Sequence, residues 1–271
     1  MEFVEVQGER VPALGFGTWQ LRGAACSEGV QDALKMGYRH IDTAQGYDNE
    51  DQVGEGIRRS GVGRDEIFLV TKVRPTNFRH DDAQASTRES LEKLGTDWVD
   101  LLLLHWPNPD VPLEETLGAL AELQDEGIVK HLGVSNFPPS LAEEANGITR
   151  IFANQVEYHP YLAQPKLTKQ AVGMDYMLTA YSPLGKGRVI GDQTLRDIGE
   201  AHGKSAAQVA LRWLVQQDHV STIPKAASAE HRRSNLDIFD FELSDEEMDR
   251  VHALDENDRI IEPADAPNWE R

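Results

Sequence analysis

Segments typical of buried strands alternate with segments typical of helices along almost the whole chain, and this alternation restricts the possible folds more than any other feature. The expected strands are short and apolar on both faces, as in Ile67–Lys72 and Trp98–Leu104. Glycines such as Gly61 and Gly95 follow the expected helices. Strands that are apolar on both faces are typical of parallel sheets covered by helices. Eight such units, joined by right-handed crossovers within 271 residues, predict an α/β fold of the (β/α)8 TIM-barrel type.

A few elements are expected outside this repeat. Phe3–Val6 and Arg10–Val11 predict a small N-terminal β-hairpin. Gln193–His202 and Ser244–Leu254 predict two helices in addition to those of the barrel. No shift in composition marks a domain boundary, so residues 1–271 are expected to form a single barrel domain.

The composition narrows the environment and the partners of the protein. The sequence has no apolar run long enough to span a membrane and no N-terminal signal pattern. Cys26 is the only cysteine, which excludes an internal disulfide and a cysteine-based metal cluster. We therefore expect a reducing, cytoplasmic location. We also expect a monomer.

The charge is strongly acidic. Asp and Glu total 46 against 27 Lys and Arg, for a formal net charge of -19. Such a surface disfavours nucleic acid and anionic membranes as partners. Only nine of the basic residues are lysines, and the acidic residues are scattered along the chain. Two interpretations stay open, a halophilic protein adapted to high salt and ordinary acidic solubility.

The stretch 38–50 predicts a strand, a loop and the start of a helix, with Asp42 at the strand end and Tyr47 in the loop. Lys72 and His105 end the next two strands. The carboxyl ends of barrel strands meet at one rim, where the active sites of such barrels lie. We therefore expect these four side chains to converge. Taken alone, Asp42 and Tyr47 also fit a structural role in which Asp42 caps the loop and Tyr47 packs on it.

The four residue types suit one kind of chemistry. A tyrosine has an ordinary pKa of about 10 and is a weak acid at neutral pH. A nearby lysine cation stabilises the phenolate, and an aspartate holds that lysine charged and in place. A histidine can donate a hydrogen bond to a carbonyl oxygen and orient it. The set is suited to protonating a carbonyl oxygen while a hydride arrives at the carbon.

Polar residues also end the remaining strands of the predicted barrel. They are Ser135, Asn136, Gln155, Glu157, Tyr181, Ser182 and Lys225. With these residues in place, the sequence resembles the aldo-keto reductases, the barrel-fold NAD(P)H-dependent carbonyl reductases. The matching segments are LGFGTW (14–19), GYRHIDTAQGYDNE (37–50), VTK (70–72), LLLLHWP (101–107), GVSNF (133–137), NQVEYHP (154–160), AYSPLG (180–185) and IPKAASAEHRRSNL (223–236).

The resemblance implies roles for particular residues. It makes Asp42, Tyr47, Lys72 and His105 a catalytic tetrad with Tyr47 as the proton donor. It places the cofactor on Gly17, Thr18, Asp42, Ser135, Asn136, Gln155, Tyr181, Ser182, Leu184, Gly185, Lys225, Ser228, His231 and Asn235. It places a small aldehyde or ketone substrate against Trp19, Tyr47, His105 and Trp106, with Arg74 at the pocket edge. It implies NADP as cofactor, with NAD also plausible, and no metal.

The sequence departs from the family pattern at the expected adenosine end and at one pocket position. Ala226 and His231 stand where the family usually has a serine and an arginine that help to hold the 2′-phosphate of NADP. Lys225 is retained. Arg74 stands where an aromatic residue is common, and an exposed loop arginine is the ordinary alternative.

Other hypotheses are weaker. A catalytically weak, cofactor-binding regulatory subunit of the same fold need not retain all four catalytic groups. A metal-dependent hydrolase would need more ligands than His40 and Asp42 supply, and His40 is expected to pack in the core. Gly185-Lys186-Gly187 lacks the spacing of a dinucleotide fingerprint and is interpreted as structural. The natural substrate depends on loops and on the tail Ile260–Arg271, which follow no readable pattern.

Overall fold

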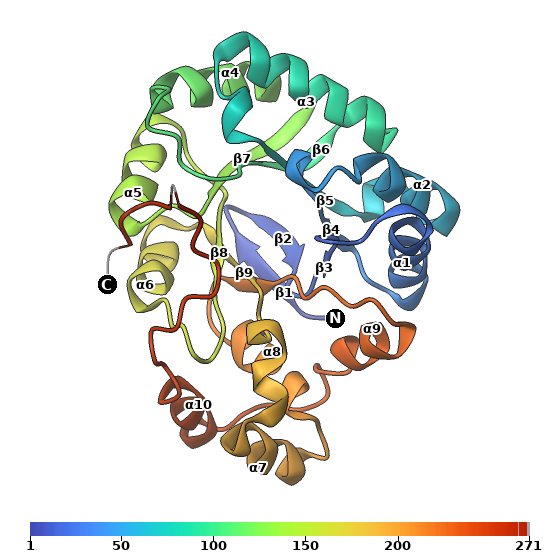
Figure 1. Ribbon diagram of the computed structural model, residues 1–271, viewed down its shortest axis with the longest axis vertical. Helices are drawn as coiled ribbons and strands as arrows, with labels where there is room; N and C mark the ends of the chain where they lie inside the picture. Colours follow the sequence, from blue (N-terminus) through green and yellow to red (C-terminus); the bar gives the residue numbers. More distant parts are fainter. Residues whose placement is uncertain (265, 270–271) are drawn as a thin grey trace.

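The centre of the protein is a parallel sheet that curls into a barrel (Figure 1). The computed structural model describes residues 1–264 and 266–269. Within these residues the sheet has eight strands, paired in chain order. They are β3 (Phe16–Gly17), β4 (His40–Asp42), β5 (Phe68–Val73), β6 (Val99–Leu104), β7 (Val129–Ser135), β8 (Ala153–Glu157), β9 (Met177–Tyr181) and β10 (Val220–Thr222).

A short parallel bridge between Leu14 and Thr222 closes the barrel. The amide of Gly15 donates to the carbonyl of Thr222, and the amide of Thr222 donates to the carbonyl of Ala13, each over 2.8 Å. The first and last strands are thereby joined just before β3. The predicted (β/α)8 barrel is confirmed.

Helices surround the sheet (Figure 1). Those that follow the barrel strands are α1 (Gly23–Met36), α2 (Glu50–Ser60), α3 (His80–Leu94), α4 (Leu113–Asp125), α5 (Pro139–Ile148), α6 (Pro165–Met174), α8 (Ala206–Val215) and α9 (Ala229–Leu236). The two additional helices are α7 (Gln193–His202) and α10 (Asp245–His252), as expected. Glycines permit the closest helix packing, because a Cβ on Gly56 would lie 2.6 Å from the carbonyl oxygen of Ser27.

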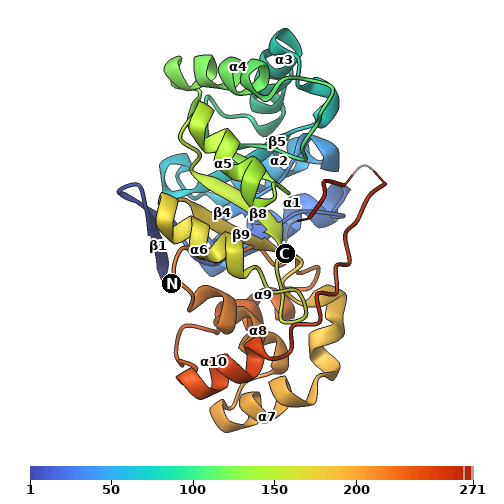
Figure 2. The ribbon, with the colours of Figure 1, turned by 90° about the vertical axis from the view of Figure 1, so that its left-hand side faces the viewer.

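The two ends of the barrel are covered differently. The hairpin of β1 (Phe3–Val6) and β2 (Glu9–Pro12) lies at one end and buries Val4, Val6 and Val11. The chain after α10 runs along the other end, as the turned view in Figure 2 shows. The site described below therefore has the C-terminal segment as a neighbour.

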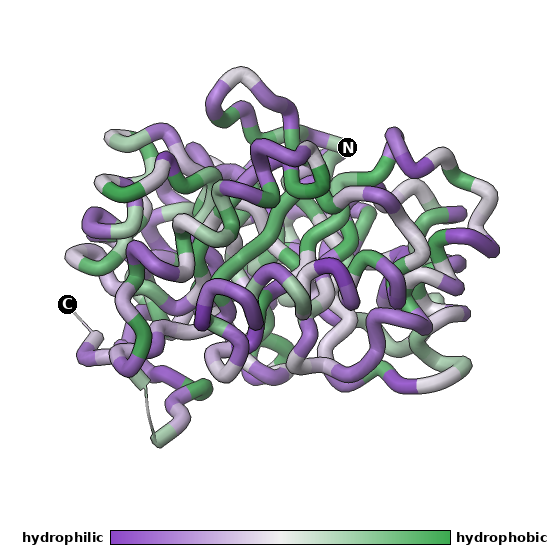
Figure 3. The backbone as a smooth tube through the Cα atoms, turned by 90° about the horizontal axis from the view of Figure 1, so that it is seen from above, coloured by the Kyte–Doolittle hydropathy of each residue, from purple (hydrophilic) through white to green (hydrophobic). Residues whose placement is uncertain are grey.

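The interior is apolar and the periphery polar (Figure 3). All residues of β6 are buried, as expected for a strand covered on both sides. His40 is buried as well, with Nδ1 3.2 Å from the carbonyl oxygen of Pro12 and its ring edge-on to Phe68. It packs in the core, as predicted.

Candidate active site

Asp42, Lys72 and Tyr47 form a hydrogen-bonded chain at the carboxyl ends of β4 and β5. The Lys72 Nζ donates to Asp42 Oδ1 at 2.6 Å, to the Thr43 carbonyl oxygen at 2.9 Å and to Tyr47 Oη at 3.3 Å. Lys72 and Asp42 are buried, so their ion pair is shielded from water. A short 3-10 helix, η1 (Gln45–Tyr47), carries Tyr47 back toward the strand ends.

Asn49 fixes the loop that carries Tyr47. It precedes α2 at the N-cap position, but its side chain makes no cap hydrogen bond. Instead it accepts from Thr43 Oγ1 at 2.8 Å and donates to the carbonyl oxygens of Thr18 and Leu21. This buried amide connects the loops after β3 and β4 and so holds Tyr47 in place.

His105 lies beside Tyr47 immediately after β6. The two rings meet edge to face with their centroids 5.6 Å apart. Burial, and then the nearby cations Lys72 and Arg74, lower the pKa of His105 to about 3. The imidazole is therefore neutral at physiological pH and can donate a hydrogen bond without carrying charge.

Burial, and then the Asp42 carboxylate, raise the pKa of Tyr47 well above its ordinary value. Burial lowers the pKa of Lys72, although Asp42 opposes this. The sequence predicts a lowered pKa for Tyr47 beside Lys72, and this net direction is wrong, because burial and Asp42 raise the pKa. The phenol keeps its proton at neutral pH, as a proton donor requires.

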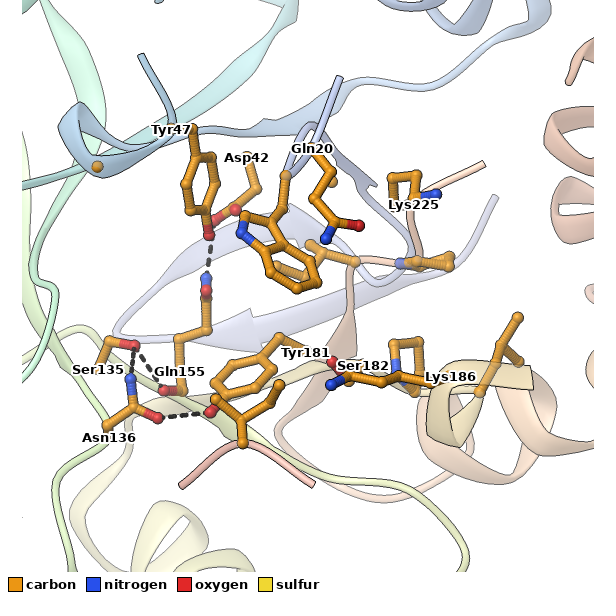
Figure 4. A pocket seen from close by; sticks show the side chains of 18 of the residues that line it. Gln20, Asp42, Tyr47, Ser135, Asn136, Gln155, Tyr181, Ser182, Lys186 and Lys225 are labelled. Carbon is orange, nitrogen blue, oxygen red and sulfur yellow. Dashed lines mark hydrogen bonds between the residues drawn. The ribbon is translucent and has the colours of Figure 1, made fainter. Parts of the chain in front are cut away.

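A cavity of about 730 Å³ opens in front of these side chains. In Figure 4, Tyr47 and Asp42 lie on one side of it, and Lys225 and Lys186 lie on the opposite side. The predicted site residues that line it are Gly17, Trp19, Asp42, Tyr47, His105, Trp106, Ser135, Asn136, Gln155, Tyr181, Ser182, Leu184 and Lys225.

Side-chain amides and hydroxyls form one wall of the cavity (Figure 4). Gln155 Nε2 donates to Asp42 Oδ2 at 2.8 Å, so both oxygens of this carboxylate are held. Ser135 Oγ donates to the Gln155 carbonyl oxygen, and Tyr181 Oη donates to Asn136 Oδ1 at 2.7 Å. The wall is therefore internally ordered and presents amide groups to a ligand.

Other predicted site residues lie behind the wall or beyond it. Thr18 Oγ1 donates to the Asp42 carbonyl oxygen at 2.9 Å, and Lys72 lies behind Tyr47. Gly185 begins the 3-10 segment η4 (Gly185–Gly191). Ser228 caps α9 by accepting from the His231 amide, His231 itself is exposed, and Asn235 is buried in α9.

Arg74 does not fit its predicted place at the pocket edge. Its guanidinium donates to the Gln45 carbonyl oxygen and pairs with Asp48, and its amide donates to Gln45 Oε1 at 3.0 Å. These contacts hold the side chain against the loop of Tyr47, and Arg74 is not among the residues that line the cavity. Arg74 supports that loop.

The structure also adds residues that the sequence did not assign to the site. Gln20, Lys186, Gly187 and Ile261 line the cavity. The sequence pattern indicates a structural role for the segment that contains Lys186 and Gly187. That interpretation is corrected, because both residues line the cavity. The signal in the sequence was the pair of glycines around Lys186, and in the structure both glycines adopt positive φ angles. Ile261 belongs to the tail, of which residues 265, 270 and 271 lie outside the described part.

The donor set fits a nicotinamide dinucleotide better than a metal ion. The wall offers amides near Tyr47 and cations at the far end, matching a polar ring and phosphates. Across the described residues, no three His, Cys, Asp or Glu side chains gather as potential metal ligands. None of the helices in the described part of the chain has the length and apolar character needed to cross a membrane.

Barrel, tetrad and cavity together define an NAD(P)H-dependent oxidoreductase that reduces carbonyl groups. The sequence profile of the aldo/keto reductase family matches residues 13–256. The chain belongs to the aldo/keto reductase family.

Named relatives agree with this assignment. The chain is 41% identical to a glyoxal reductase of Bacillus subtilis (strain 168), with 93% of this chain and 92% of that protein covered. It is 40% identical to the methylglyoxal reductase DkgB of Escherichia coli O157:H7, with coverage of 96% and 99%. A crystal structure of a provisionally named 2,5-diketo-D-gluconic acid reductase B matches at a TM-score of 0.98 with 48% identity, covering 100% of this chain and 98% of that one. The regulatory-subunit alternative gains no support from these relatives.

Proposed function

We propose that the protein reduces the aldehyde group of small 2-oxoaldehydes such as methylglyoxal, with NADPH preferred and NADH accepted. The hydrogen-bonded chain from Asp42 through Lys72 to Tyr47 at the cavity wall carries the proposal. The relatives named as glyoxal and methylglyoxal reductases support the substrate class.

In this proposal Tyr47 is the proton donor to the carbonyl oxygen. Lys72 lies 3.3 Å from Tyr47 Oη and stabilises the phenolate that proton transfer leaves behind. Asp42 keeps Lys72 charged and oriented, and neutral His105 donates a hydrogen bond that orients the carbonyl. The bound nicotinamide supplies the hydride.

The cofactor contacts belong to the same proposal. Ser135, Asn136 and Gln155 would bind the carboxamide, and the Tyr181 ring would lie along the nicotinamide. Ser182, Leu184 and Gly185 would follow the pyrophosphate. Lys225 is exposed at the far end of the cavity and would meet the 2′-phosphate, which supports a preference for NADPH.

Tyr47→Phe tests the assignment of the proton donor. The variant keeps the ring and loses the acid, so kcat for methylglyoxal should fall by about 10²–10⁴. Cofactor affinity, measured by quenching of intrinsic fluorescence, should stay within about twofold because the acid does not hold the cofactor. Tyr176→Phe is a matched control, since it removes a hydroxyl that bonds Gln170 away from the cavity. Nearly normal reduction by Tyr47→Phe would overturn the proposal.

A further inference from the structure

Glu157 ends β8 two residues after Gln155, yet it does not line the cavity. Its side chain is fully buried, as is that of His159. A carboxylate in such a position is stable only when its oxygens are hydrogen-bonded. The partners of Glu157 therefore indicate its role.

Both carboxylate oxygens of Glu157 bind the backbone of the C-terminal tail. The amide of Ile260 donates to Oε1 and the amide of Ile261 donates to Oε2, each at 2.8 Å. His159 Nε2 lies 2.9 Å from Oε1. Burial raises the pKa of Glu157, but hydrogen bonds from His159, Ile260 and Ile261 outweigh burial and hold the pKa below its ordinary value.

The tail held in this way forms part of the pocket. Ile261 lines the cavity together with Tyr47, His105 and Trp106. Further along, the ring of Trp269 packs edge-on against Trp106, with centroids 6.2 Å apart. The position of residues 260–261 thus determines the shape of the cavity near the reacting end.

The side-chain ion pairs that hold this segment are more exposed than Glu157. Arg188 of η4 pairs with Glu256 and Asp258 at 2.6 Å each, but these side chains are 38–60% exposed. Exposed ion pairs contribute little to stability. Glu157, by contrast, is a buried side chain, and it binds the two tail residues next to the pocket.

We propose that Glu157 is a positioning residue that fixes the C-terminal tail as a wall of the carbonyl-substrate pocket. This inference rests on the proposed function for the identity of the substrate. Glu157 acts through the backbone of Ile260 and Ile261. Its loss should weaken substrate binding while leaving proton transfer and cofactor binding intact.

Glu157→Gln is the first test, because a side-chain amide presents a donor to one of the two tail amides and so breaks a hydrogen bond. We expect KM for methylglyoxal and for the larger 4-nitrobenzaldehyde to rise by about tenfold, with kcat and NADPH affinity changed by less than about twofold. Asp100→Asn is the matched control. Asp100 is a buried carboxylate at the start of β6 that accepts hydrogen bonds from the Leu69 amide and from Lys130. Its substitution removes a comparable buried charge, but at the amino-terminal end of a strand.

Limited trypsin digestion supplies a readout that needs no substrate. The bond between Arg259 and Ile260 is a trypsin site beside the anchor. In Glu157→Gln, release of the tail peptide, followed by mass spectrometry, should be about tenfold faster, because cleavage follows the population of the opened segment. In Asp100→Asn the rate should match that of the unmodified protein.

Ile260→Pro removes the backbone N–H that donates a hydrogen bond to Glu157 Oε1, and Ile260→Ala keeps it. Ile260→Pro should raise KM as Glu157→Gln does, Ile260→Ala should not, and KM of the double variant Glu157→Gln/Ile260→Pro should be no higher than that of either single variant. Tail cleavage is compared only in Glu157→Gln and Ile260→Ala, because trypsin does not cleave an Arg–Pro bond. Fully additive effects, or a Glu157→Gln enzyme with unchanged KM and tail cleavage, would overturn the inference. Failure of the unmodified protein to reduce methylglyoxal would instead overturn the proposed function, with the digestion result still standing.

Discussion

His105 illustrates at the scale of one residue how burial determines chemistry. Its pKa of about 3 leaves the imidazole neutral from about pH 4 upward, so the ring can orient a carbonyl but cannot act as a cationic acid. We predict that kcat/KM for aldehyde reduction shows no inflection from a histidine between about pH 5 and 8. His105→Gln, which keeps a neutral donor, should lose less activity than His105→Phe, for which about 10²–10³ is expected.

A pH profile of both variants and the unmodified enzyme checks this prediction. A step near pH 6.5 that disappears in His105→Gln would show instead that His105 is protonated during catalysis. Cofactor affinity is the control, because it depends on the proposed contacts of Tyr181 and Lys225. Equal affinity in both variants and the unmodified enzyme would show that neither substitution has disturbed the cavity.

Individual site residues could be predicted where backbone position alone brings them together. Asp42 ends β4, Lys72 is the penultimate residue of β5 and His105 directly follows β6, so the barrel places them at one rim regardless of side-chain detail. Arg74 could not be placed this way, because its orientation depends on contacts with Gln45 and Asp48 across a loop. Its role is fixed by tertiary structure.

Among the elements, some helix ends could be predicted from the positions of glycines and others could not. Gly61 and Gly95 end α2 and α3 in the left-handed conformation, as their positions predict. Gly147 and Gly173 do not end their helices, because α5 and α6 continue through them to Ile148 and Met174. Packing of a helix on the barrel can outweigh the modest cost of an internal glycine.

In the proposed function, helix α9 and the segment before it determine the preference between NADPH and NADH. Arg232 cannot replace the missing arginine at 231, since it pairs with Asp32 of α1 and donates to the carbonyls of Ala226 and Ala227. Lys225 is left as an exposed point charge. We predict that NADPH is preferred over NADH by about tenfold or less, the value of one exposed ion pair.

Lys225→Met should erase this preference, and His231→Arg should increase it by tightening NADPH more than NADH, because an arginine binds phosphate with two parallel hydrogen bonds. The ratio of kcat/KM for the two cofactors is the measurement. A preference above about 10³ in the unmodified enzyme, worth about 4 kcal/mol, would mean that another residue holds the 2′-phosphate.

At the scale of the whole molecule, the net charge of -19 lies on a polar exterior around an apolar barrel (Figure 3). Helix α4 shows how the charge is distributed. It carries Glu114, Glu115, Glu122 and Asp125 and no basic residue, and Asp125 stands in the last turn. An acidic side chain there opposes the helix dipole. Charge repulsion of this kind weakens when salt screens it.

We predict that the melting temperature rises with KCl from low salt into the molar range, where the Debye length falls to about 3 Å at 1 M. Asp125→Lys should stabilise the protein at low salt by about 0.3–1 kcal/mol and by less at about 2 M KCl. Asp51→Lys makes the same change in net charge in the first turn of α2, where an acid is favourable, so it should not stabilise. If repulsion across the whole surface dominates, both variants will flatten the dependence of melting temperature on KCl. A melting temperature that falls as KCl rises above about 0.15 M would show instead that the acidic surface serves ordinary solubility.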